Sequence, residues 1–292
     1  MKDKFGQRIN HMNISVTEEC NLCCTYCRPE EGIACPSETT MMKMEDFLNV
    51  VEASVALGIH SFTIMGGEPL LWEPLKDFIK AMKQIPEVER VTLQSNGLLL
   101  CPVLSELVEA GIDGVSLHMD TTQSQQYKRL TRGKISSAEA IKPVWQAVAA
   151  NIPTTIICVM QEETKNEVMI LAGLAKHYPL DVKFAEVRPI RWCHEAVPYS
   201  KEEALKRMKI SYPDLESVGE DELSDGTEFY KSAELKGRIG IMNDGKNVLH
   251  VSNTGKLSRG FGEVDYCDLM PLLRGNGTKA EIKAAMRTFI LN

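Results

Sequence analysis

The chain has 292 residues, of which 43% are hydrophobic and 25% charged, values that are typical of a folded globular protein and exclude a disordered one. Its 33 Lys and Arg residues against 40 Asp and Glu residues give a net charge of −7, so no excess positive charge is available for a nucleic-acid backbone or an anionic membrane. No apolar run reaches the ~18 residues of a membrane span, and the polar N-terminus lacks the apolar stretch of an export signal. We therefore expect a cytoplasmic protein that binds neither nucleic acid nor membrane.

Six short runs rich in Val, Ile, Thr or Phe predict β-strands in the first two-thirds of the chain. They are Met12–Val16, Ser61–Met65, Val91–Ser95, Gly114–His118, Thr154–Met160 and Asp181–Val187. A helical pattern follows each of them, and strands that alternate with helices are typical of a parallel sheet covered by helices. A closed eight-fold barrel needs about 250 residues, whereas these six units end near residue 187. We therefore predict an α/β fold, an open, partial (β/α)6 barrel of the TIM type.

Two of the helical patterns predict apolar faces that pack on this sheet. Lys43–Leu57 is the first, and Asn166–His177, with Ile170, Leu174 and His177 on one face, is the second. Both segments have the length of ordinary globular helices, so each is expected to be one continuous helix.

The last third of the chain has a different pattern and is predicted to be an α+β extension. It contains a helix at Ser200–Lys209, a polar loop at Ser217–Thr227, two short strands at Arg238–Met242 and Val248–Ser252, and a final helix at Lys279–Phe289. We expect two parts, a barrel at 1–195 and an extension at 196–292.

The most unusual residue strings each follow a predicted strand. They are the cysteine-rich stretch after residue 16, Gly66–Pro69, Ser95–Gly97, His118–Asp120 and Arg188–His194. In barrels and open α/β sheets the ligand lies at the carboxyl ends of the strands. The functional site is therefore predicted at this end.

Nine cysteines are present, and five of them fall between Cys20 and Cys35, which favours a metal centre over disulfides. Cys20, Cys24 and Cys27 have the spacing C-x3-C-x2-C. Three thiolates on one loop can hold three irons of a [4Fe–4S] cluster and leave the fourth iron open to a small ligand. The alternative is a structural zinc site completed by Cys23 or Cys35.

Two motifs together resemble those of the radical S-adenosylmethionine (SAM) superfamily, in particular of enzymes similar to the GTP-cyclising enzyme of molybdenum-cofactor biosynthesis. The first is the cysteine loop with its flanking residues 14–30, and the second is Met65–Leu71, which reads Met-Gly-Gly-Glu-Pro-Leu-Leu. The resemblance implies one [4Fe–4S] cluster held by Cys20, Cys24 and Cys27. It also implies that the amino group of SAM is bound by Gly66, Gly67, Glu68 and Pro69.

Further residues match the family at the ends of other strands. By resemblance, Ser95, Asn96 and Ser116 would contact the nucleoside or carboxylate of SAM, and Tyr26 the adenine side. The alternative for each is an ordinary polar residue of a turn or strand end. The resemblance implies that a reduced cluster cleaves SAM, that the deoxyadenosyl radical removes a hydrogen from a substrate, and that an external one-electron donor of the flavodoxin or ferredoxin type supplies the electron.

The chain departs from the cyclising enzymes in two respects. After Cys35 it has no closely spaced pair of cysteines, and Gly260 stands where the family has the last ligand of a second cluster. Asn13 and Thr63 occupy places where the family has arginines, and Thr155 one where it has lysine. Since a triphosphate needs such cations, we predict a single cluster and no GTP cyclisation.

Polar residues around the end of the sixth strand are candidates for catalysis. Arg188, with Arg191 nearby, could clamp a carboxylate or phosphate of the substrate. The alternative is a pair of surface arginines that answer Glu186 and a neighbouring acid. Glu186 is itself a candidate, and Cys193 is the first candidate for returning a hydrogen atom to the product radical.

Two further candidates have stronger structural alternatives. His118, at the end of the fourth strand, is either a catalytic residue or a core histidine with satisfied partners. Cys158 is a weaker candidate hydrogen donor, because a cysteine in the middle of a strand usually packs in the core.

These observations predict a radical SAM enzyme that acts on a small anionic metabolite such as a sugar or nucleoside. Without a second cluster to accept electrons, a redox-neutral reaction of the lyase or isomerase type is favoured: epimerisation, elimination, decarboxylation or isomerisation. The alternatives are modification of a ribosomal peptide and a non-catalytic iron–sulfur or zinc protein.

Overall fold

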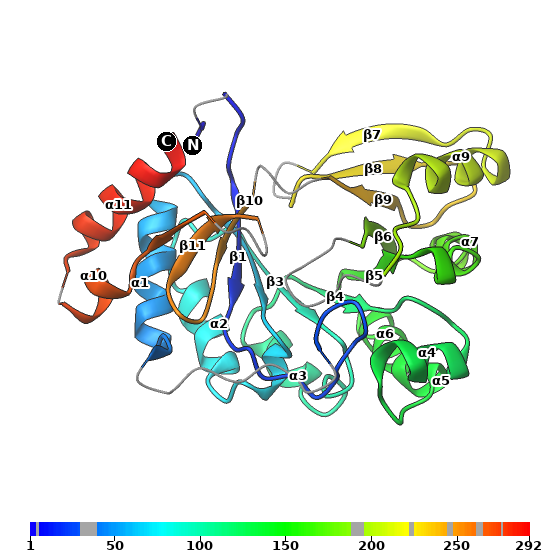
Figure 1. Ribbon diagram of the computed structural model, residues 1–292, viewed down its shortest axis with the longest axis horizontal. Coiled ribbons are helices and arrows are strands. Elements are labelled where there is room, and N and C mark those ends of the chain that lie inside the picture. The colour runs from blue at the N-terminus through cyan, green and yellow to red at the C-terminus, as the bar shows by residue number, and fades with distance from the viewer. Residues whose placement is uncertain are drawn as a thin grey trace.

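The computed structural model describes residues 1–3, 6–29, 40–187, 196–221, 225–243, 248–260, 265–275 and 277–292. One curved 12-stranded sheet organises the molecule, in the order β12-β11-β10-β1-β2-β3-β4-β5-β6-β9-β8-β7 (Figure 1). The sheet ends at β12 on one side and at β7 on the other, so the barrel is open, as predicted. No helix among the described residues is long and apolar enough to cross a membrane.

The six predicted strands are confirmed to within one residue at either end. They are β1 His11–Ser15, β2 Ser61–Met65, β3 Arg90–Ser95, β4 Gly114–His118, β5 Thr154–Met160 and β6 Asp181–Glu186. Each is parallel to its neighbour in this series. Their carboxyl ends therefore lie along one rim, where the candidate motifs of the sequence meet.

Helices cover the outer face of the barrel strands (Figure 1). They are α1 Met44–Val55, η2 Pro69–Leu71, α2 Leu75–Lys83, α3 Leu104–Glu109, α4 Ser124–Thr131, α5 Ser137–Ala140, α6 Lys142–Ala149, η3 Glu162–Thr164, α7 Glu167–Ala172 and α8 Leu174–His177. The predicted helix at Lys43–Leu57 is confirmed as α1, whose Phe47 packs edge-on against Trp72 and tilted against Phe78, with ring centroids 5.7 and 5.8 Å away. These aromatic contacts join α1 to α2 and to the chain between η2 and α2.

The single helix predicted for Asn166–His177 is wrong in both continuity and facing. The segment divides at Gly173 into α7 and α8, and Ile170, expected toward the sheet, is 49% exposed. The buried residues have the three, four, seven spacing of a helical stripe: Val168, Leu171, Ala172 and Ala175. This stripe buries two small alanines, which the sequence reading passed over in favour of the larger Ile170.

The last third of the chain adds strands to both edges of the barrel. β9 Ile239–Met242 is parallel to β6, and β10 Val248–Val251 is parallel to β1. Three antiparallel strands continue the sheet beyond these two: β8 Thr227–Lys231, β11 Lys256–Arg259 and β12 Tyr266–Asp268. The short helix α10 Met270–Arg274 follows β12. α9 Lys201–Ser211 and α11 Lys279–Leu291 correspond to the two predicted helices, and α11 packs beside α1.

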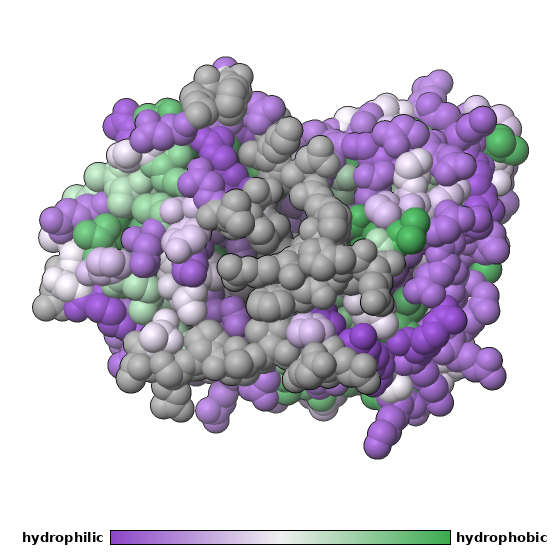
Figure 2. Space-filling view, in the orientation of Figure 1, coloured by the Kyte–Doolittle hydropathy of each residue, from purple (hydrophilic) through white to green (hydrophobic). Residues whose placement is uncertain are grey.

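The polar loop predicted at Ser217–Thr227 is a second correction. Its first four residues belong to β7 Glu216–Glu220 and its last residue begins β8, and these strands pair antiparallel with a bulge between Ser217 and Gly219. Every residue of β7 is exposed, and the surface over β7 and α9 is largely hydrophilic (Figure 2). A strand with two polar faces has no apolar alternation, so the sequence gives no sign of it.

Candidate active site

The cysteine loop follows β1 and is fixed to the end of α4. The backbone N–H of Cys23 donates to the Thr131 carbonyl at 3.2 Å, and that of Thr25 donates to the Leu130 carbonyl at 2.8 Å. These backbone bonds hold the loop against the barrel rim without using its thiols. The position of the loop therefore does not depend on a metal ion or on a disulfide.

Three of the four described thiols in the loop form one group, and the fourth points elsewhere. Burial is the main cause that raises the pKa of Cys20, Cys24 and Cys27, and each of the last two is raised further by Cys20. Cys23 instead donates its S–H to the Pro29 carbonyl at 2.9 Å. Among the described residues no three His, Cys, Asp or Glu side chains converge on a single ion. The assignment of Cys20, Cys24 and Cys27 to a [4Fe–4S] cluster therefore rests on their C-x3-C-x2-C spacing, which suits three thiolate ligands on one loop.

The Gly66–Pro69 motif lies directly against the chain that leads into this loop. Gly67 donates its N–H to Thr17 O and Glu68 to Glu19 O, both at 2.7 Å. A Cβ atom at Gly67 would lie 2.1 Å from Glu19 O, a distance that real Cβ atoms do not show. Glycine is therefore required here for a close backbone approach. This contact places the two motifs of the sequence side by side, as the resemblance implies.

Glu68 is fully buried and joins the ends of β2 and β3. One carboxylate oxygen accepts hydrogen bonds from Leu70 N–H at 3.1 Å and from Ser95 Oγ at 2.7 Å, and the other accepts one from Asn96 N–H at 2.9 Å. Burial raises the pKa of Glu68, and these hydrogen bonds oppose that rise. Ser95 is buried as well, and its hydroxyl also accepts the Gly97 N–H at 2.9 Å.

The end of β3 also reaches the cysteine loop through a side chain. The Nδ2 atom of Asn96 donates to Asn21 Oδ1 at 2.7 Å and lies 3.9 Å from the Cys20 sulfur. Asn96, a predicted SAM contact, therefore reaches one of the cysteines predicted to hold the cluster.

Tyr26 connects the loop to the ends of β4 and β5. Its hydroxyl donates to Asp120 Oδ2 at 2.5 Å, and the other oxygen of Asp120 accepts from Val159 N–H at 2.7 Å. Burial raises the pKa of Asp120 to about 6. Asp120 was missed as a site residue, although it stands two residues beyond the end of a predicted strand.

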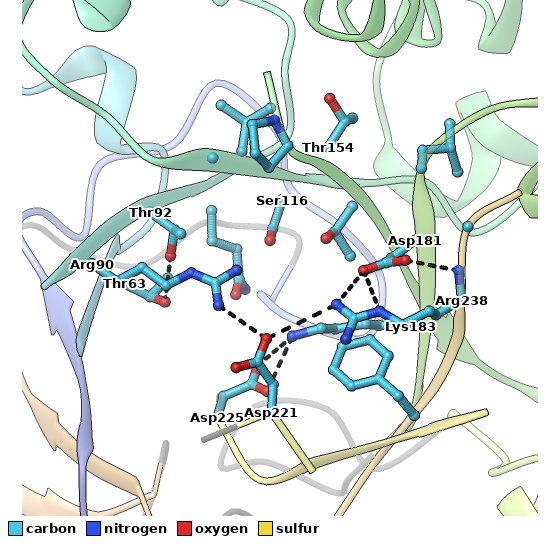
Figure 3. Close-up of a pocket in the computed structure, with 18 of the residues that line it drawn as sticks. Thr63, Arg90, Thr92, Ser116, Thr154, Asp181, Lys183, Asp221, Asp225 and Arg238 are labelled. Carbon is cyan, nitrogen blue, oxygen red and sulfur yellow. Dashed lines mark hydrogen bonds and ion pairs between the residues drawn. The ribbon is translucent and has the colours of Figure 1, made fainter. Parts of the chain in front are cut away.

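A cavity of about 510 Å³ lies inside the barrel (Figure 3). Its wall carries every second residue of the strands, for example Arg90, Thr92 and Gln94 on β3 and Ser116 on β4. Buried parallel strands usually read as continuous apolar runs, so polar residues at alternate positions were the signal that could have revealed this cavity. Ser116, predicted to contact SAM, lies in this wall.

The positions where the resemblance expects cations carry an uncharged network around His11. The Nε2 atom of His11 lies 3.0 Å from Thr63 Oγ1 and 3.2 Å from Asn13 Oδ1, and its Nδ1 atom lies 2.9 Å from Ser61 Oγ. Burial lowers the pKa of His11 to about 4, so the imidazole is neutral at pH 7. Thr63 and Thr155 both line the cavity.

His118 lies two residues beyond Ser116 on the same face of β4, at the rim above the cavity. Gln94 Nε2 lies 2.9 Å from His118 Nε2, so the amide donates and the ring proton is on Nδ1. This Nδ1 atom is buried and has no hydrogen-bond partner in the described part of the chain. Burial lowers the pKa of His118 to about 4. A neutral imidazole with an unused N–H is thus held between the rim and the cavity.

The remaining catalytic candidates have different outcomes. Arg188 and Cys193 lie outside the described residues and stay predictions. Glu186 accepts the backbone N–H of Lys201 at 2.6 Å, so its carboxylate caps the first turn of α9. Cys158 is fully buried and belongs to the hydrophobic core, which matches its structural alternative.

A set of ion pairs at the opposite end of the cavity was not predicted. Arg90, Lys183 and Arg238 pair with three acids of the same region (Figure 3). Two of these acids, Asp221 and Asp225, flank the turn of the hairpin that the sequence pattern presented as a loop. Polar composition alone could not indicate that they reach the barrel.

Comparison with known proteins agrees with the motifs and their placement. The family model described as the Radical SAM superfamily matches residues 14–175. The chain belongs to this superfamily. The cofactors of the protein are accordingly a [4Fe–4S] cluster and S-adenosylmethionine.

Radical SAM relatives of known name are similar over most of the chain. The GTP 3',8-cyclase of Peptoclostridium acidaminophilum is 30% identical over 291 residues, which cover 94% of this chain and 87% of that protein. The GTP 3',8-cyclase of Clostridium perfringens (strain SM101 / Type A) is 32% identical over 246 residues, 83% of this chain and 75% of that one. The resemblance to the cyclising enzymes is thereby confirmed.

Solved structures agree on the fold. Streptococcus suis SuiB bound to S-adenosylmethionine has a TM-score of 0.68 at 12% identity and covers 97% of this chain and 68% of that one. The structure of anSMEcpe with bound AdoMet and Cp18Cys peptide has a TM-score of 0.64 at 16% identity, with 96% and 82% coverage. At such identities the likeness shows the fold alone.

Proposed function

We propose that this radical SAM enzyme removes a hydrogen atom from a small polar metabolite of the sugar or nucleoside class, held in the barrel cavity, in a redox-neutral reaction. The supporting observation is the continuity of the cavity with the cofactor rim. Gln94 and Ser116 line the cavity, and Ser95, Asn96 and His118, one or two residues further along the same strands, belong to the rim. A substrate in the cavity would therefore lie next to bound SAM.

When bound, the cluster and SAM supply the reductive cleavage whose deoxyadenosyl product abstracts a hydrogen atom from the substrate. Cys20, Cys24 and Cys27 would hold the cluster, and their raised pKa means that the protons leave as iron binds. The Glu68 carboxylate and Asn96 order the rim on which SAM is held. The cavity wall orients the substrate and limits its contact with water, which is the usual contribution of the protein to radical catalysis.

His118 is the residue best placed to contact the substrate directly. Its Nδ1–H is buried and unpaired within the described residues, and Gln94 fixes the tautomer. A substrate hydroxyl or carbonyl that accepts this proton would satisfy a group whose isolation is otherwise unfavourable. We propose this contact as a positioning hydrogen bond.

The redox-neutral outcome is proposed from the sequence. No closely spaced cysteine pair follows Cys35, so the chain offers no second cluster as an electron acceptor. Epimerisation, elimination, decarboxylation and isomerisation leave the overall oxidation level of the substrate unchanged, so they need no such acceptor. A flavodoxin or ferredoxin is proposed as the external electron donor. Cys193 keeps its proposed role as the hydrogen donor, whereas the anion contact expected of Arg188 does not fit an uncharged substrate.

Anaerobic reconstitution tests the proposal at its base. The native chain should bind about four iron atoms, as expected for one [4Fe–4S] cluster, and should form deoxyadenosine from SAM under reduction. Cys24→Ser should abolish both. Cys23→Ser is the matched control, because this thiol is engaged with Pro29 and should leave iron content and cleavage intact. Equal loss in the two variants would contradict the assignment.

The substrate class is tested by anaerobic turnover with deuterated sugars and nucleosides. Transfer of deuterium into deoxyadenosine identifies the substrate and the position attacked. Label from a ribosomal peptide but from no small metabolite would overturn the proposal.

GTP cyclisation is the second candidate function, and the printed names of the relatives favour it. Thr63 and Thr155 in the cavity wall oppose it, because they offer no charge to a triphosphate. Incubation of the reconstituted protein with GTP and SAM decides between the two. We expect no GTP-derived product, and formation of a cyclised nucleotide would replace our proposal.

A further inference from the structure

We propose that the barrel cavity selects an uncharged, hydroxyl-bearing ligand, and that the β7–β8 hairpin enforces this choice by neutralising the cations of the cavity with Asp221 and Asp225. The proposal rests on the proposed function in that the cavity is the substrate site, and it narrows the substrate class. A nucleoside or sugar without phosphate would be accepted, and its phosphorylated form rejected.

Each of the three inner cations of the cavity has a carboxylate partner (Figure 3). Lys183 Nζ lies 3.1 Å from Asp225 Oδ1, Arg90 Nη1 lies 3.2 Å from Asp221 Oδ2, and Arg238 Nη2 lies 2.7 Å from Asp181 Oδ2. Asp221 also lies 4.0 Å from Arg238 and so bridges the two arginines. The three positive charges face three negative ones.

The pair of Lys183 with Asp225 is the most buried, with side chains 12% and 16% exposed. Burial acts to raise the pKa of Asp225, but the charges of Lys183 and His11 and the hydrogen bonds from Thr227 and Lys183 together outweigh it and hold this pKa well below its usual range. Asp225 is therefore ionised at neutral pH. Thr227 Oγ1 also donates to Asp225 Oδ1 at 2.5 Å, which orients the carboxylate from within the hairpin.

The ring of Phe229 contacts two of these cations, Arg238 and Lys183. Its ring centroid lies 3.8 Å from the guanidinium carbon of Arg238 and 5.4 Å from Lys183 Nζ. Cation–π contacts at these distances favour the observed positions of the cations. Arg238 and Lys183 are thus held by the hairpin through both charge and aromatic contact.

Two further lysines, Lys231 and Lys236, line the cavity, so its wall as a whole carries five cations and three carboxylates. Lys231 donates its ammonium group to the carbonyls of Lys236 and Gly237, at 2.9 and 2.7 Å. Lys236 is exposed. A phosphate that reached the inner cations would therefore have to displace carboxylates that are already bound to them, and would meet like charge there.

Another part of the cavity wall is built from uncharged groups. Thr63, Thr92, Gln94, Ser116 and Thr155 come from four adjacent strands and carry hydroxyl or amide groups. Such groups both donate and accept hydrogen bonds, as the hydroxyls of a sugar do. Paired charges in one part of the wall and hydroxyl groups in another together indicate a neutral polar ligand.

Binding of tripolyphosphate and GTP by calorimetry, with the cluster-loaded protein at low salt, tests the proposal. Asp221→Asn/Asp225→Asn frees two charges of the cavity and should bind tripolyphosphate at least about tenfold more tightly than the native chain. Glu216→Gln/Glu220→Gln removes two carboxylates from the exposed strand of the same hairpin and should show no such gain. Asp221→Asn alone, at the more exposed pair, should give a smaller gain and serves if the double variant does not fold.

The position of the effect is checked by adding Lys183→Gln to the double variant, which should abolish the gained affinity. The native chain should also bind guanosine more tightly than GTP. Native binding of tripolyphosphate as tight as that of the double variant, or an equal gain from Glu216→Gln/Glu220→Gln, would overturn the proposal. SAM cleavage without added substrate is measured on the native chain and on each variant. If the native chain does not cleave SAM, the proposed function is refuted, but the proposed charge pairing in the cavity is not.

Discussion

The two ends of the barrel are held together by different kinds of contact. At the carboxyl ends of the strands, the cysteine loop and the Gly66–Pro69 motif meet through backbone hydrogen bonds of 2.7 Å and a buried carboxylate, Glu68. In the cavity, by contrast, Asp221 and Asp225 from the segment between β7 and β8 pair with long basic side chains of the barrel strands. Backbone contacts hardly tolerate change, whereas ion pairs between long side chains can be exchanged one at a time. We therefore expect the cofactor end to tolerate substitution less than the ion pairs of the cavity.

The largest effect that this comparison predicts is at Gly67. In Gly67→Ala the new Cβ would lie 2.1 Å from Glu19 O and 2.6 Å from Arg28 Nη2, so the motif and the cysteine loop must separate. We expect SAM cleavage to fall below detection and stability to fall by about 1–3 kcal/mol, measured by deoxyadenosine formation and denaturant unfolding.

Gly173→Ala is the control for this glycine, because its Cβ would lie in a helical segment at 3.2 Å from the Ile170 carbonyl. It should cleave SAM at the native rate. If Gly67→Ala cleaves SAM as well as this control, the backbone contact between the two motifs is not needed for cofactor binding.

Glu68→Gln is expected to have the next largest effect. An amide in place of the carboxylate would direct N–H groups at one or more of the donors Leu70 N, Ser95 Oγ and Asn96 N. An unsatisfied buried donor costs about 1–3 kcal/mol, and SAM affinity should fall about tenfold or more. Equilibrium dialysis with SAM measures this, with the exposed Glu109→Gln as control. Unchanged affinity in Glu68→Gln would show that the rim does not depend on this carboxylate.

Three buried histidines predict that stability is lost in weak acid. Burial lowers the pKa of His11, His118 and His250 to about 4 in the folded chain. Because the unfolded chain binds their protons below about pH 6.5, this stability is present above pH 6.5 and falls as the pH drops toward 4, by up to about 1.4 kcal/mol per pH unit for each histidine. Urea unfolding at pH 7.5, 6 and 5 measures it.

Single substitutions show how much each histidine contributes to this pH dependence of stability. His11→Asn removes the histidine at the cavity, and His118→Asn the one at the rim; each should reduce the pH dependence by about one proton. A slope that neither substitution changes would show that other groups are responsible.

The smallest effect is expected within the cavity wall. Thr92→Val removes a hydroxyl that lies 2.9 Å from Thr63 Oγ1, while Thr63 keeps its contact with His11. We expect the free energy of unfolding to fall by about 0.5–1.5 kcal/mol and the KM for the substrate to rise. SAM cleavage without substrate should stay at the native rate. If that basal cleavage is lost, the two ends are not independent.

The strands and the cofactor rim could be predicted from the sequence because both depend on local pattern. A buried strand is a run of Val, Ile and Phe, and a close backbone approach needs glycines such as Gly66 and Gly67. The β7 strand could not be predicted, because an exposed edge with polar groups on both faces has the composition of a loop. The ion pairs could not be predicted either. Asp221 pairs with Arg90, which lies 131 residues away in the sequence, and no local residue pattern indicates such a contact.

Ile170 illustrates a different limit. Its size made it the expected anchor of its helix, yet Ala172 and Ala175 are buried in its place. Which of two adjacent helix faces packs on a sheet depends on the shape of the surface opposite. That shape is fixed by strands elsewhere in the chain, so the residue pattern of one helix does not determine it.

The pairing of β1 with β10 has a consequence for synthesis. β1 carries the cysteine loop at its end and is bonded to β2 on one side and, from His11↔Val248 to Ile14↔Val251, to β10 on the other. A nascent chain on the ribosome therefore cannot close this edge until residues 248–251 have emerged, and non-local pairing of this kind is slow to form. The thiols that follow β1 remain beside an incomplete sheet for most of translation, so protection of the iron site from oxidation begins only when nearly the whole polypeptide has been made.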